Sequence, residues 1–299
     1  MPSKERNVSA LALTLYDERG SMWMVDCGEA TQHQILSTPL KAGKLEKLFI
    51  THLHGDHIFG LPGLMSSRSH QGGDTPLTLY GPKGLRLFVE TSITVSGTRL
   101  NYDWNVIEID EEGVVFDDNQ FRVDVVRLEH RIECFGYRIT EADLPGRLMI
   151  DKLVARGIPK GPHLARLKAG EDVTLADGTT LRSAEYVGSP RPGRVLAILG
   201  DTRYCEAAIR LARGADLLVH EATFDARHTE HAGLYGHSTA DEAARVALEA
   251  GVGTLILTHL SSRYQGEDEE ELLKEARSVF ANTLLAKDFM EFDIDLRAE

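Results

Sequence analysis

Short runs of β-branched and other apolar residues recur along the chain, each followed by polar residues or glycine, a pattern typical of buried strands. Between these runs, Glu206–Arg213 and Ala240–Ala250 have apolar residues at helical spacing, and Ser238 or Thr239 is the expected N-cap of the second helix. Strands that alternate with helices predict an α/β fold. We predict strands at Met22–Val25, Leu45–Ile50, Val123–Leu128, Val195–Leu199, Leu217–Val219 and Thr254–Leu257.

The stretch from about Leu144 to Arg194 interrupts this alternation. It contains five prolines, many glycines and a hairpin-like segment, Val173–Leu181, in which Asp177-Gly178 is a strong two-residue turn signal. We therefore predict a single domain over residues 1–299, with an insertion at about 144–194 that projects from the main body and is not part of its core.

The charge distribution is uneven. The formal net charge is −13, which argues against general binding of nucleic acid. From Arg147 to Lys168, however, there are six basic residues and a single acidic one, Asp151. The net charge of this segment is therefore +5, and that of the rest of the chain is −18. This basic segment fits either a solvated face or a patch that binds a polyanion.

Membrane insertion and disulfide bonding are not expected. No apolar run approaches the roughly 18 residues that a membrane-spanning helix needs, and Met1–Arg6 is too polar for a signal peptide. Cys27, Cys134 and Cys205 are odd in number and far apart, which argues against a disulfide framework and against thiolate metal sites. These features predict a cytoplasmic protein.

The strongest chemical signal is Thr51-His52-Leu53-His54-Gly55-Asp56-His57, directly after the predicted strand Leu45–Ile50. It places four side chains that can bind metal within six residues. Imidazole and carboxylate together suit zinc, manganese or iron, and ligands at the end of a strand are held by the sheet while staying open to solvent.

Other predicted strands end in the same kind of residue. A single histidine or aspartate at a strand end is weak evidence, but several at one edge of a sheet are where α/β proteins place their sites. These strand-end residues are Glu129-His130, Asp201, His220-Glu221 and His259.

The run His52-x-His54-x-Asp56-His57, followed by His130, Asp201 and His259, resembles the signature of the metallo-β-lactamase superfamily. The resemblance implies an αβ/βα four-layer sandwich of two mixed sheets with outer helices. It also implies two zinc ions per chain. His52, His54 and His130 would bind one ion, Asp56, His57 and His259 the other, and Asp201 would bridge them.

Longer motifs are similar to those of the bacterial ribonuclease Z family, also called ribonuclease BN. The resemblance covers nearly the whole chain and implies a metal-dependent endoribonuclease that removes the 3′ trailer from precursor tRNA and leaves a 3′-hydroxyl, with exonucleolytic trimming left open. It also implies a homodimer, no DNA partner, and a role for the basic insertion as a flexible arm that grips tRNA. The motifs are Arg6-Asn7, Asp26-Cys27-Gly28-Glu29-Ala30-Thr31-Gln32, Gly60-Leu61-Pro62-Gly63-Leu64, Tyr80-Gly81-Pro82, His220-Glu221-Ala222-Thr223-Phe224, Gly236-His237-Ser238-Thr239 and Ser262-Arg263-Tyr264.

One difference from this family concerns the start of the chain. Family members have a hydrophobic strand and a glycine-rich turn ahead of the segment that matches Pro2–Asn7, and this sequence starts at Met1 without them. We expect the metal residues to be unaffected and the sheet to have unpaired backbone at one edge, with an effect on stability and on dimer formation.

The resemblance also implies catalytic roles. Asp56 would orient or deprotonate the attacking water as well as bind metal, and His237 would protonate the leaving 3′ oxygen while Glu221 holds its imidazole. Alternatively, His237 caps the helix that begins near Ser238. We expect the remaining histidines outside the motifs to lie outside the site, and we leave Ser66, Ser67, Arg68 and Arg263 unassigned, although each could contact phosphate.

Two other functions stay open. One is a hydrolase of the same fold that acts on a small molecule such as a phosphodiester, because this fold hosts many chemistries. The other is a non-catalytic RNA-binding protein that keeps metal for its structure. Shared ligation through Asp201 favours catalysis, because structural zinc sites are closed to water. Manganese or cobalt could substitute for zinc on the same ligands.

Overall fold

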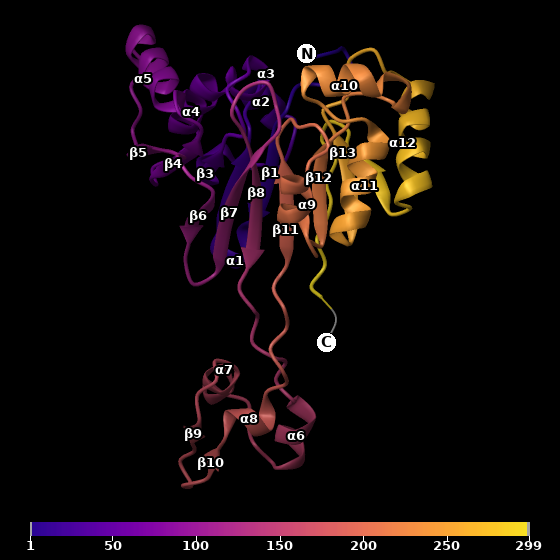
Figure 1. Ribbon diagram of the computed structural model, residues 1–299. Helices are drawn as coiled ribbons and strands as arrows, with labels where there is room; N and C mark the ends of the chain where they lie inside the picture. Colours follow the sequence, from indigo (N-terminus) through magenta and orange to yellow (C-terminus); the bar gives the residue numbers. More distant parts are fainter. Residues whose placement is uncertain (1, 298–299) are drawn as a thin grey trace. The chain divides into compact units, whose positions relative to one another are not determined.

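The computed structural model describes residues 2–297, which form two compact units. Of the described residues, unit 1 comprises 2–117, Arg122–Ile139 and Val195–Phe292. Unit 2 comprises Asp118–Phe121, Thr140–Arg194 and 293–297. Unit 1 contains the two large sheets and the helices that cover them (Figure 1).

The first sheet is five-stranded, in the order β1-β2-β3-β4-β5. The edge strand β1 is antiparallel to β2, and the remaining pairs are parallel. Its outer face packs on helices around buried residues such as Leu48, Leu64 and Val89. The elements are β1 (Leu11–Leu15), α1 (Tyr16–Arg19), β2 (Ser21–Val25), α2 (Thr31–Ile35), η1 (Ala42–Lys44), β3 (Leu45–Phe49), α3 (Gly55–Ile58), α4 (Leu61–His70), β4 (Leu77–Gly81), α5 (Leu85–Ser96) and β5 (Trp104–Glu108).

The second sheet is seven-stranded, in the order β14-β13-β12-β11-β8-β7-β6. Strands β11 to β14 are parallel, whereas β6 and β7 are antiparallel. Its helices α9, α11 and α12 bury an alanine-rich core against the strands. The elements are β6 (Gly113–Asp117), β7 (Phe121–Leu128), β8 (Cys134–Glu141), β11 (Val195–Leu199), α9 (Glu206–Ala212), β12 (Leu217–Glu221), η2 (Ala226–His228), α10 (Thr229–Tyr235), α11 (Ala240–Ala250), β13 (Thr254–Thr258), α12 (Glu267–Val279) and β14 (Thr283–Leu285).

Aromatic side chains join the inner faces of the two sheets. Trp23 of β2 contacts Phe116 of β6 edge-on, with ring centres 5.5 Å apart. Phe49 of β3 contacts Tyr137 of β8 at 5.2 Å, and the Tyr137 hydroxyl donates to the Ile50 carbonyl at 2.6 Å. Large aromatic side chains dominate such cores because each buries a large apolar area. The two sheets are thereby packed face to face, with helices outside.

The predicted elements of unit 1 are confirmed. Each predicted strand and helix differs from the observed one by two residues or fewer at either end. Thr239 is the N-cap of α11, in a capping box with Glu242. The neighbouring Ser238 instead donates its hydroxyl to the Thr202 carbonyl at 2.6 Å. His237 is therefore not the cap of this helix, and the alternative role given to it by sequence is wrong.

Unit 2 has a small hydrophobic core of its own, formed by Leu153, Leu167, Val173, Leu181 and Tyr186. Its helices were not predicted, because each is only four to six residues long. The predicted hairpin is present, but its loop has three residues, Ala176, Asp177 and Gly178, instead of the expected two. Gly178 has a φ of +88°, the left-handed conformation found at the last position of three-residue loops. Its elements are α6 (Ile150–Ala155), α7 (His163–Lys168), β9 (Val173–Thr174), β10 (Thr180–Leu181) and α8 (Ser183–Tyr186).

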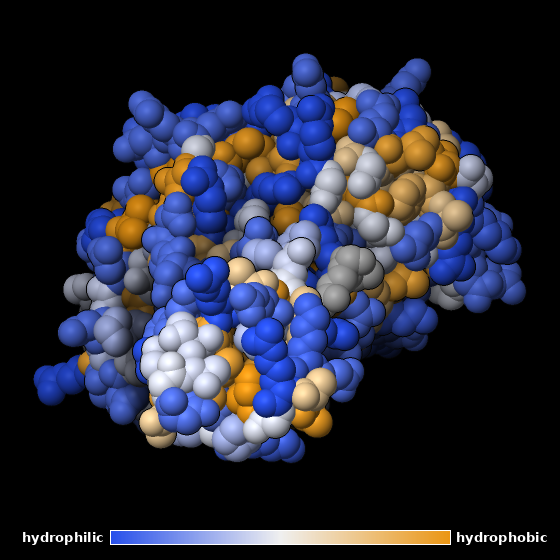
Figure 2. Space-filling view, turned by 90° about the horizontal axis from the view of Figure 1, so that it is seen from below, coloured by the Kyte–Doolittle hydropathy of each residue, from blue (hydrophilic) through white to orange (hydrophobic). Residues whose placement is uncertain are grey.

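The surface shown in Figure 2 is largely hydrophilic, with hydrophobic residues gathered in several places. Among residues 2–297, none of the helices is both long and apolar enough to cross a membrane.

Candidate metal centre

Three of the predicted ligands converge with their ring nitrogens facing one another. His52 and His54 follow β3, and His130 follows β7. His52 Nε2 lies 3.0 Å from His54 Nδ1, and His130 Nε2 lies 3.3 Å from the same atom. A neutral imidazole has only one N–H, so His54 Nδ1 must serve both neighbouring nitrogens with a single hydrogen or a single lone pair. A cation bound by the three lone pairs would satisfy all three nitrogens.

The other three predicted ligands, Asp56, His57 and His259, form a second group. His259 Nε2 lies 3.6 Å from an Asp56 carboxylate oxygen. The Nε2 atoms of His57 and His259 are both buried, and neither has a hydrogen-bond partner. Buried polar atoms without partners are rare and call for an explanation. A divalent metal ion bound there would explain both atoms, so Asp56, His57 and His259 fit the metal that the resemblance implies.

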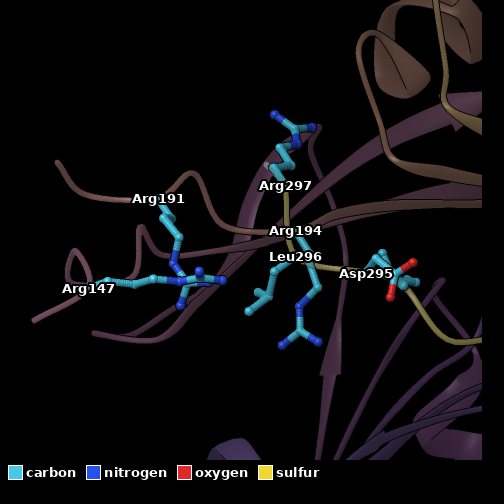
Figure 3. A pocket seen from close by; sticks show the side chains of 7 residues that line it. Arg147, Arg191, Arg194, Asp295, Leu296 and Arg297 are labelled. Carbon is cyan, nitrogen blue, oxygen red and sulfur yellow. The ribbon is translucent and has the colours of Figure 1, made fainter. Parts of the chain in front are cut away.

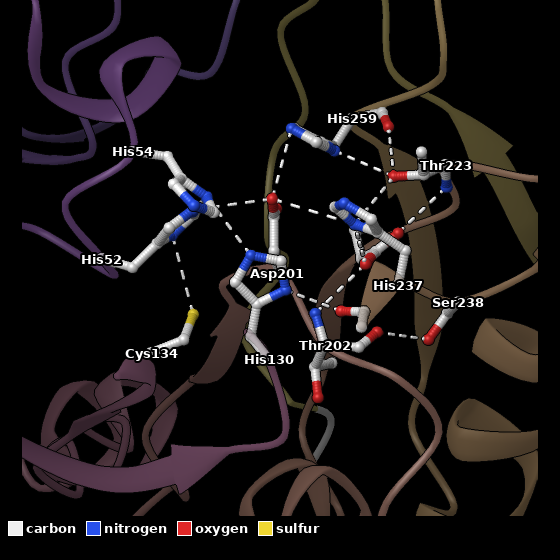
Figure 4. A network of polar contacts seen from close by, with 12 residues as sticks. His52, His54, His130, Cys134, Asp201, Thr202, Thr223, His237, Ser238 and His259 are labelled. Carbon is white, nitrogen blue, oxygen red and sulfur yellow. Dashed lines mark hydrogen bonds and ion pairs between the residues drawn. The ribbon is translucent and has the colours of Figure 1, made fainter. Parts of the chain in front are cut away.

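Asp201 lies just after β11, between His52 of the first group and His259 of the second (Figure 4). One carboxylate oxygen, Oδ2, is 3.6 Å from His52 Nε2, 3.6 Å from His57 Nε2 and 3.5 Å from His259 Nε2. Gly200 allows this approach, because a Cβ there would lie 2.5 Å from Cys134 Sγ. The structure thus brings together all seven predicted ligands. Their assignment to particular ions stays a prediction.

Asp26 supports this site, although the sequence motif that contains it predicts no role for it. Its Oδ2 lies 2.7 Å from His57 Nδ1, and its Oδ1 accepts from the Thr51 backbone at 2.8 Å. A hydrogen bond on one ring nitrogen fixes the tautomer and aims the other nitrogen at the metal. Asp26 also has a φ of +60°, which is uncommon outside glycine and is found at functional sites. Its position at the end of β2 is the signal that could have identified it.

His237 and Glu221 form a pair beside the ligands. His237 Nδ1 lies 2.8 Å from a Glu221 carboxylate oxygen and 3.3 Å from the Thr223 hydroxyl. The other Glu221 oxygen accepts from the Thr223 backbone at 3.0 Å. His237 can also be grouped with Asp201 and His259 as a metal ligand. Because Glu221 binds Nδ1, Nε2 is the nitrogen that His237 can present to a substrate.

Charge and burial perturb the titration of these groups. Burial, followed by the charge of His57, lowers the pKa of His52 to about 2. Burial also opposes protonation of His57, but the carboxylates of Asp201 and Asp26 raise its pKa well above the ordinary value. For His237, burial is opposed by the hydrogen bond and charge of Glu221, which raise the pKa. His237 is therefore suited to carry a proton.

Two residues considered from the sequence, Arg68 and His220, are buried in contacts with other protein groups instead. Arg68 is fully buried, donates to the Leu45 and Thr75 carbonyls, and stacks on the Tyr102 ring. It therefore cannot serve as a phosphate contact. His220 is also fully buried, and its Nδ1 lies 2.7 Å from the Glu221 carbonyl.

The basic segment of unit 2 is partly neutralised by acids that follow it in sequence. Arg166 pairs with Glu171 at 2.8 Å, and Arg156 lies 3.7 Å from Glu185. Positive charge nevertheless remains, because residues 144–194 hold nine basic and five acidic side chains. Unit 2 also has a pocket of about 740 Å³ (Figure 3), and four of its lining residues are arginines: Arg147, Arg191, Arg194 and Arg297.

Comparisons with known proteins agree with this geometry. A family model described as Anti-Pycsar protein Apyc1 matches residues 5–141. Ribonuclease Z of Bacillus cereus (strain G9842) is 58% identical over 295 residues, covering 99% of this chain and 96% of that protein. Ribonuclease Z of Bacillus thuringiensis (strain Al Hakam) matches equally well.

Solved structures give the same result. The crystal structure of human tRNase Z, short form, is 32% identical, with a TM-score of 0.70, and the match covers 99% of this chain and 95% of that one. The metallo-β-lactamase fold protein YhfI from Bacillus subtilis is 22% identical, with a TM-score of 0.64 and coverage of 96% and 92%, which supports the fold alone. With a shared fold and 58% identity along nearly its whole length, this chain belongs to the ribonuclease Z family.

Proposed function

We propose that this protein is a zinc-dependent phosphodiesterase that cleaves the 3′ trailer from precursor tRNA and leaves a 3′-hydroxyl on the tRNA. The observation that carries this proposal is the His237–Glu221 pair at 2.8 Å, next to the converging ligands, in a member of the ribonuclease Z family. The ligands alone fit many hydrolases, whereas a proton donor beside them suits a reaction with a poor leaving group.

We propose two zinc ions per chain, with manganese or cobalt able to replace them. His52, His54 and His130 would hold one ion, Asp56, His57 and His259 the other, and Asp201 would contact both. Divalent metal bound there would activate water and neutralise the charge that builds on the phosphate during attack. The donor set of imidazoles and carboxylates suits zinc but does not exclude the other two metals.

The side chains of this site then have separate tasks. Asp56 orients the attacking water and can accept its proton. The water oxygen forms a bond to phosphorus, and the bond from phosphorus to the 3′ oxygen breaks. His237 donates its Nε2 proton to that oxygen, so that the tRNA leaves with a hydroxyl. Glu221 stabilises the protonated imidazole through Nδ1, which keeps the donor charged until it is needed.

We further propose that residues 144–194 form the arm that binds tRNA, an insertion in a domain that spans the chain. Support comes from the excess of basic side chains and from the small core that lets this segment fold as a unit. Such a site would bind the phosphate backbone through charge, without reading sequence. By family resemblance we also expect a cytoplasmic homodimer.

Incubation with a 3′-extended precursor tRNA tests the proposal. The expected products are a tRNA with a 3′-hydroxyl and a trailer with a 5′-phosphate, and both should be absent when a chelator is present. Mapping of the new 3′ end distinguishes a single internal cut from stepwise trimming. Products with a 2′,3′-cyclic phosphate, or cleavage that persists after metal removal, would contradict the proposal.

A further inference from the structure

Two neighbouring segments beside the metal centre carry side chains that the proposed reaction does not use. Arg131 directly follows His130, and Tyr235 is the last residue of α10, two positions before His237. The guanidinium carbon of Arg131 lies 5.8 Å from the centre of the Tyr235 ring. Tyr235 is 43% exposed, so much of its ring remains available for another contact.

The backbone holds this pair close to the reacting groups. His130 Nδ1 lies 2.7 Å from the Gly236 carbonyl oxygen. Gly236 has a φ of +75°, and a Cβ there would lie 3.2 Å from the Arg131 nitrogen and from the His130 Cα. The two segments therefore touch at Gly236, and only glycine fits comfortably there. As a result, the backbone at Arg131 and Tyr235 is held close to His130 and His237.

The chemistry of this surface suits a nucleobase. Proteins that bind single-stranded RNA stack bases on exposed aromatic rings and on arginine guanidinium planes. The residues adjacent in sequence extend the apolar surface, since Leu234 is 72% exposed and Ile132 is 38% exposed. Several exposed large side chains next to a polar reaction centre indicate a ligand contact better than a single one would.

We propose that Arg131 and Tyr235 form a stacking platform for the base of the nucleotide on the 5′ side of the scissile bond, the last nucleotide that the mature tRNA retains. This inference rests on the proposed function, in which His237 protonates the 3′ oxygen of that nucleotide. Only one ribose separates a base from its own 3′ oxygen, so the base must lie near His237. Stacking accepts every base, and the platform therefore detects the presence of a base at this position, not its identity.

The test combines Tyr235→Ala with a precursor tRNA that has an abasic residue at this position. With the natural substrate, Tyr235→Ala should lower kcat/KM roughly 5- to 150-fold, the range expected for one stacked base. The abasic substrate should impose a similar loss on the unaltered protein and little further loss on Tyr235→Ala. Tyr235→Phe keeps the ring and should restore most of the activity.

Controls separate this contact from general damage. Tyr204→Ala removes a similar pair elsewhere in unit 1, where Arg245 lies 5.1 Å from the Tyr204 ring, and should leave the effect of the abasic residue unchanged. Zinc content and melting temperature of Tyr235→Ala show whether the site is intact.

If Tyr235→Ala has an intact site but its loss of activity simply adds to the loss caused by the abasic residue, this inference fails while the proposed function stands. The same holds if the effect of Tyr235→Ala depends instead on an abasic residue on the trailer side of the scissile bond. If the unaltered protein fails to cleave the natural precursor, the proposed function fails and this inference with it.

Discussion

Asp26 holds the metal centre in shape without being one of the predicted ligands. It contacts His57 at 2.7 Å and the Thr51 backbone at 2.8 Å, so a single carboxylate fixes both a ligand and the segment that carries His52. Thr51 in turn lies 3.0 Å from His52 Nδ1. Orientation of ligands by such partners typically changes metal affinity or activity 10- to 100-fold. The site therefore depends on the ends of β2 and β3 together.

Asp201 and His237 should respond differently to removal. Asp201→Ala deletes the carboxylate oxygen shared by both groups of ligands, so we expect loss of metal and of nearly all activity. His237→Ala should keep its metal and lose roughly 10²- to 10⁴-fold in rate, the usual contribution of a proton donor. Metal analysis and single-turnover cleavage of precursor tRNA distinguish these outcomes. Full turnover by His237→Ala would remove its assignment as proton donor.

At this scale the sequence predicts ligands better than their supports. His52, His130, Asp201 and His259 can be found because each follows a run of apolar residues that forms a strand. Asp26 also follows a strand, which marks it as a candidate, but its role as a partner of His57 depends on a contact between residues 31 positions apart, which leaves no local pattern. The close approach at Gly236 likewise depends on a distant loop.

Among the secondary structure elements, β8 and β11 are tied together where the chain enters and leaves residues 140–194. Arg194 donates to Glu141 through Nε at 2.7 Å and through Nη2 at 2.8 Å, and the Glu141 side chain is 6% exposed. Bidentate pairs of this kind are among the stronger polar contacts. The pair therefore fixes the geometry of both strands at this end.

Glu141→Gln should lower stability at pH 7 by about 1–3 kcal/mol, because a charged hydrogen bond is lost and Arg194 keeps its charge. Burial works against ionisation, but the hydrogen bonds from Arg194 lower the pKa of Glu141 below its usual value. The contribution is therefore full above the unfolded pKa of about 4.3 and is lost as the pH falls through the lower folded value. Denaturant unfolding at several pH values measures it. A difference between the two proteins that does not shrink in acid would contradict this explanation.

The strands that lead into the site and the helices α9 and α11 follow from local hydrophobic pattern, whereas α5, α12 and the helices of unit 2 were not predicted. A helix of 11 residues such as α11 shows its buried face and its cap in sequence. A helix of six residues such as α7 has too few turns to show a period, and its stability comes from packing of Leu167 against distant residues.

At the scale of the whole molecule, the charge is divided between a strongly acidic chain and a basic insertion. Within the described residues Lys160 and Lys168 form no ion pair, and Lys152 has only a long contact of 3.4 Å to the Glu185 carbonyl. We therefore expect these three lysines to meet tRNA phosphates. Changing all three to Gln should weaken tRNA binding and flatten its salt dependence by roughly 0.7–0.9 per lost phosphate contact.

A matched control changes the same amount of charge in unit 1. Lys41, Lys44 and Lys274 are exposed, and their replacement by Gln should leave the salt dependence nearly unchanged. Both triple variants should still hydrolyse bis(p-nitrophenyl) phosphate. Equal effects of the two sets on tRNA binding would show that overall charge, and not the insertion, governs the interaction.

The most direct test of the central claim is a zinc titration of metal-free protein, with bound metal and the rate of precursor tRNA cleavage measured in the same samples. The predicted result is cleavage that rises with bound zinc and levels off at two ions per chain, with a 3′-hydroxyl on every product tRNA. Folded protein that binds less than one ion per chain, or cleaves precursor tRNA at the same rate with and without metal, would contradict the account.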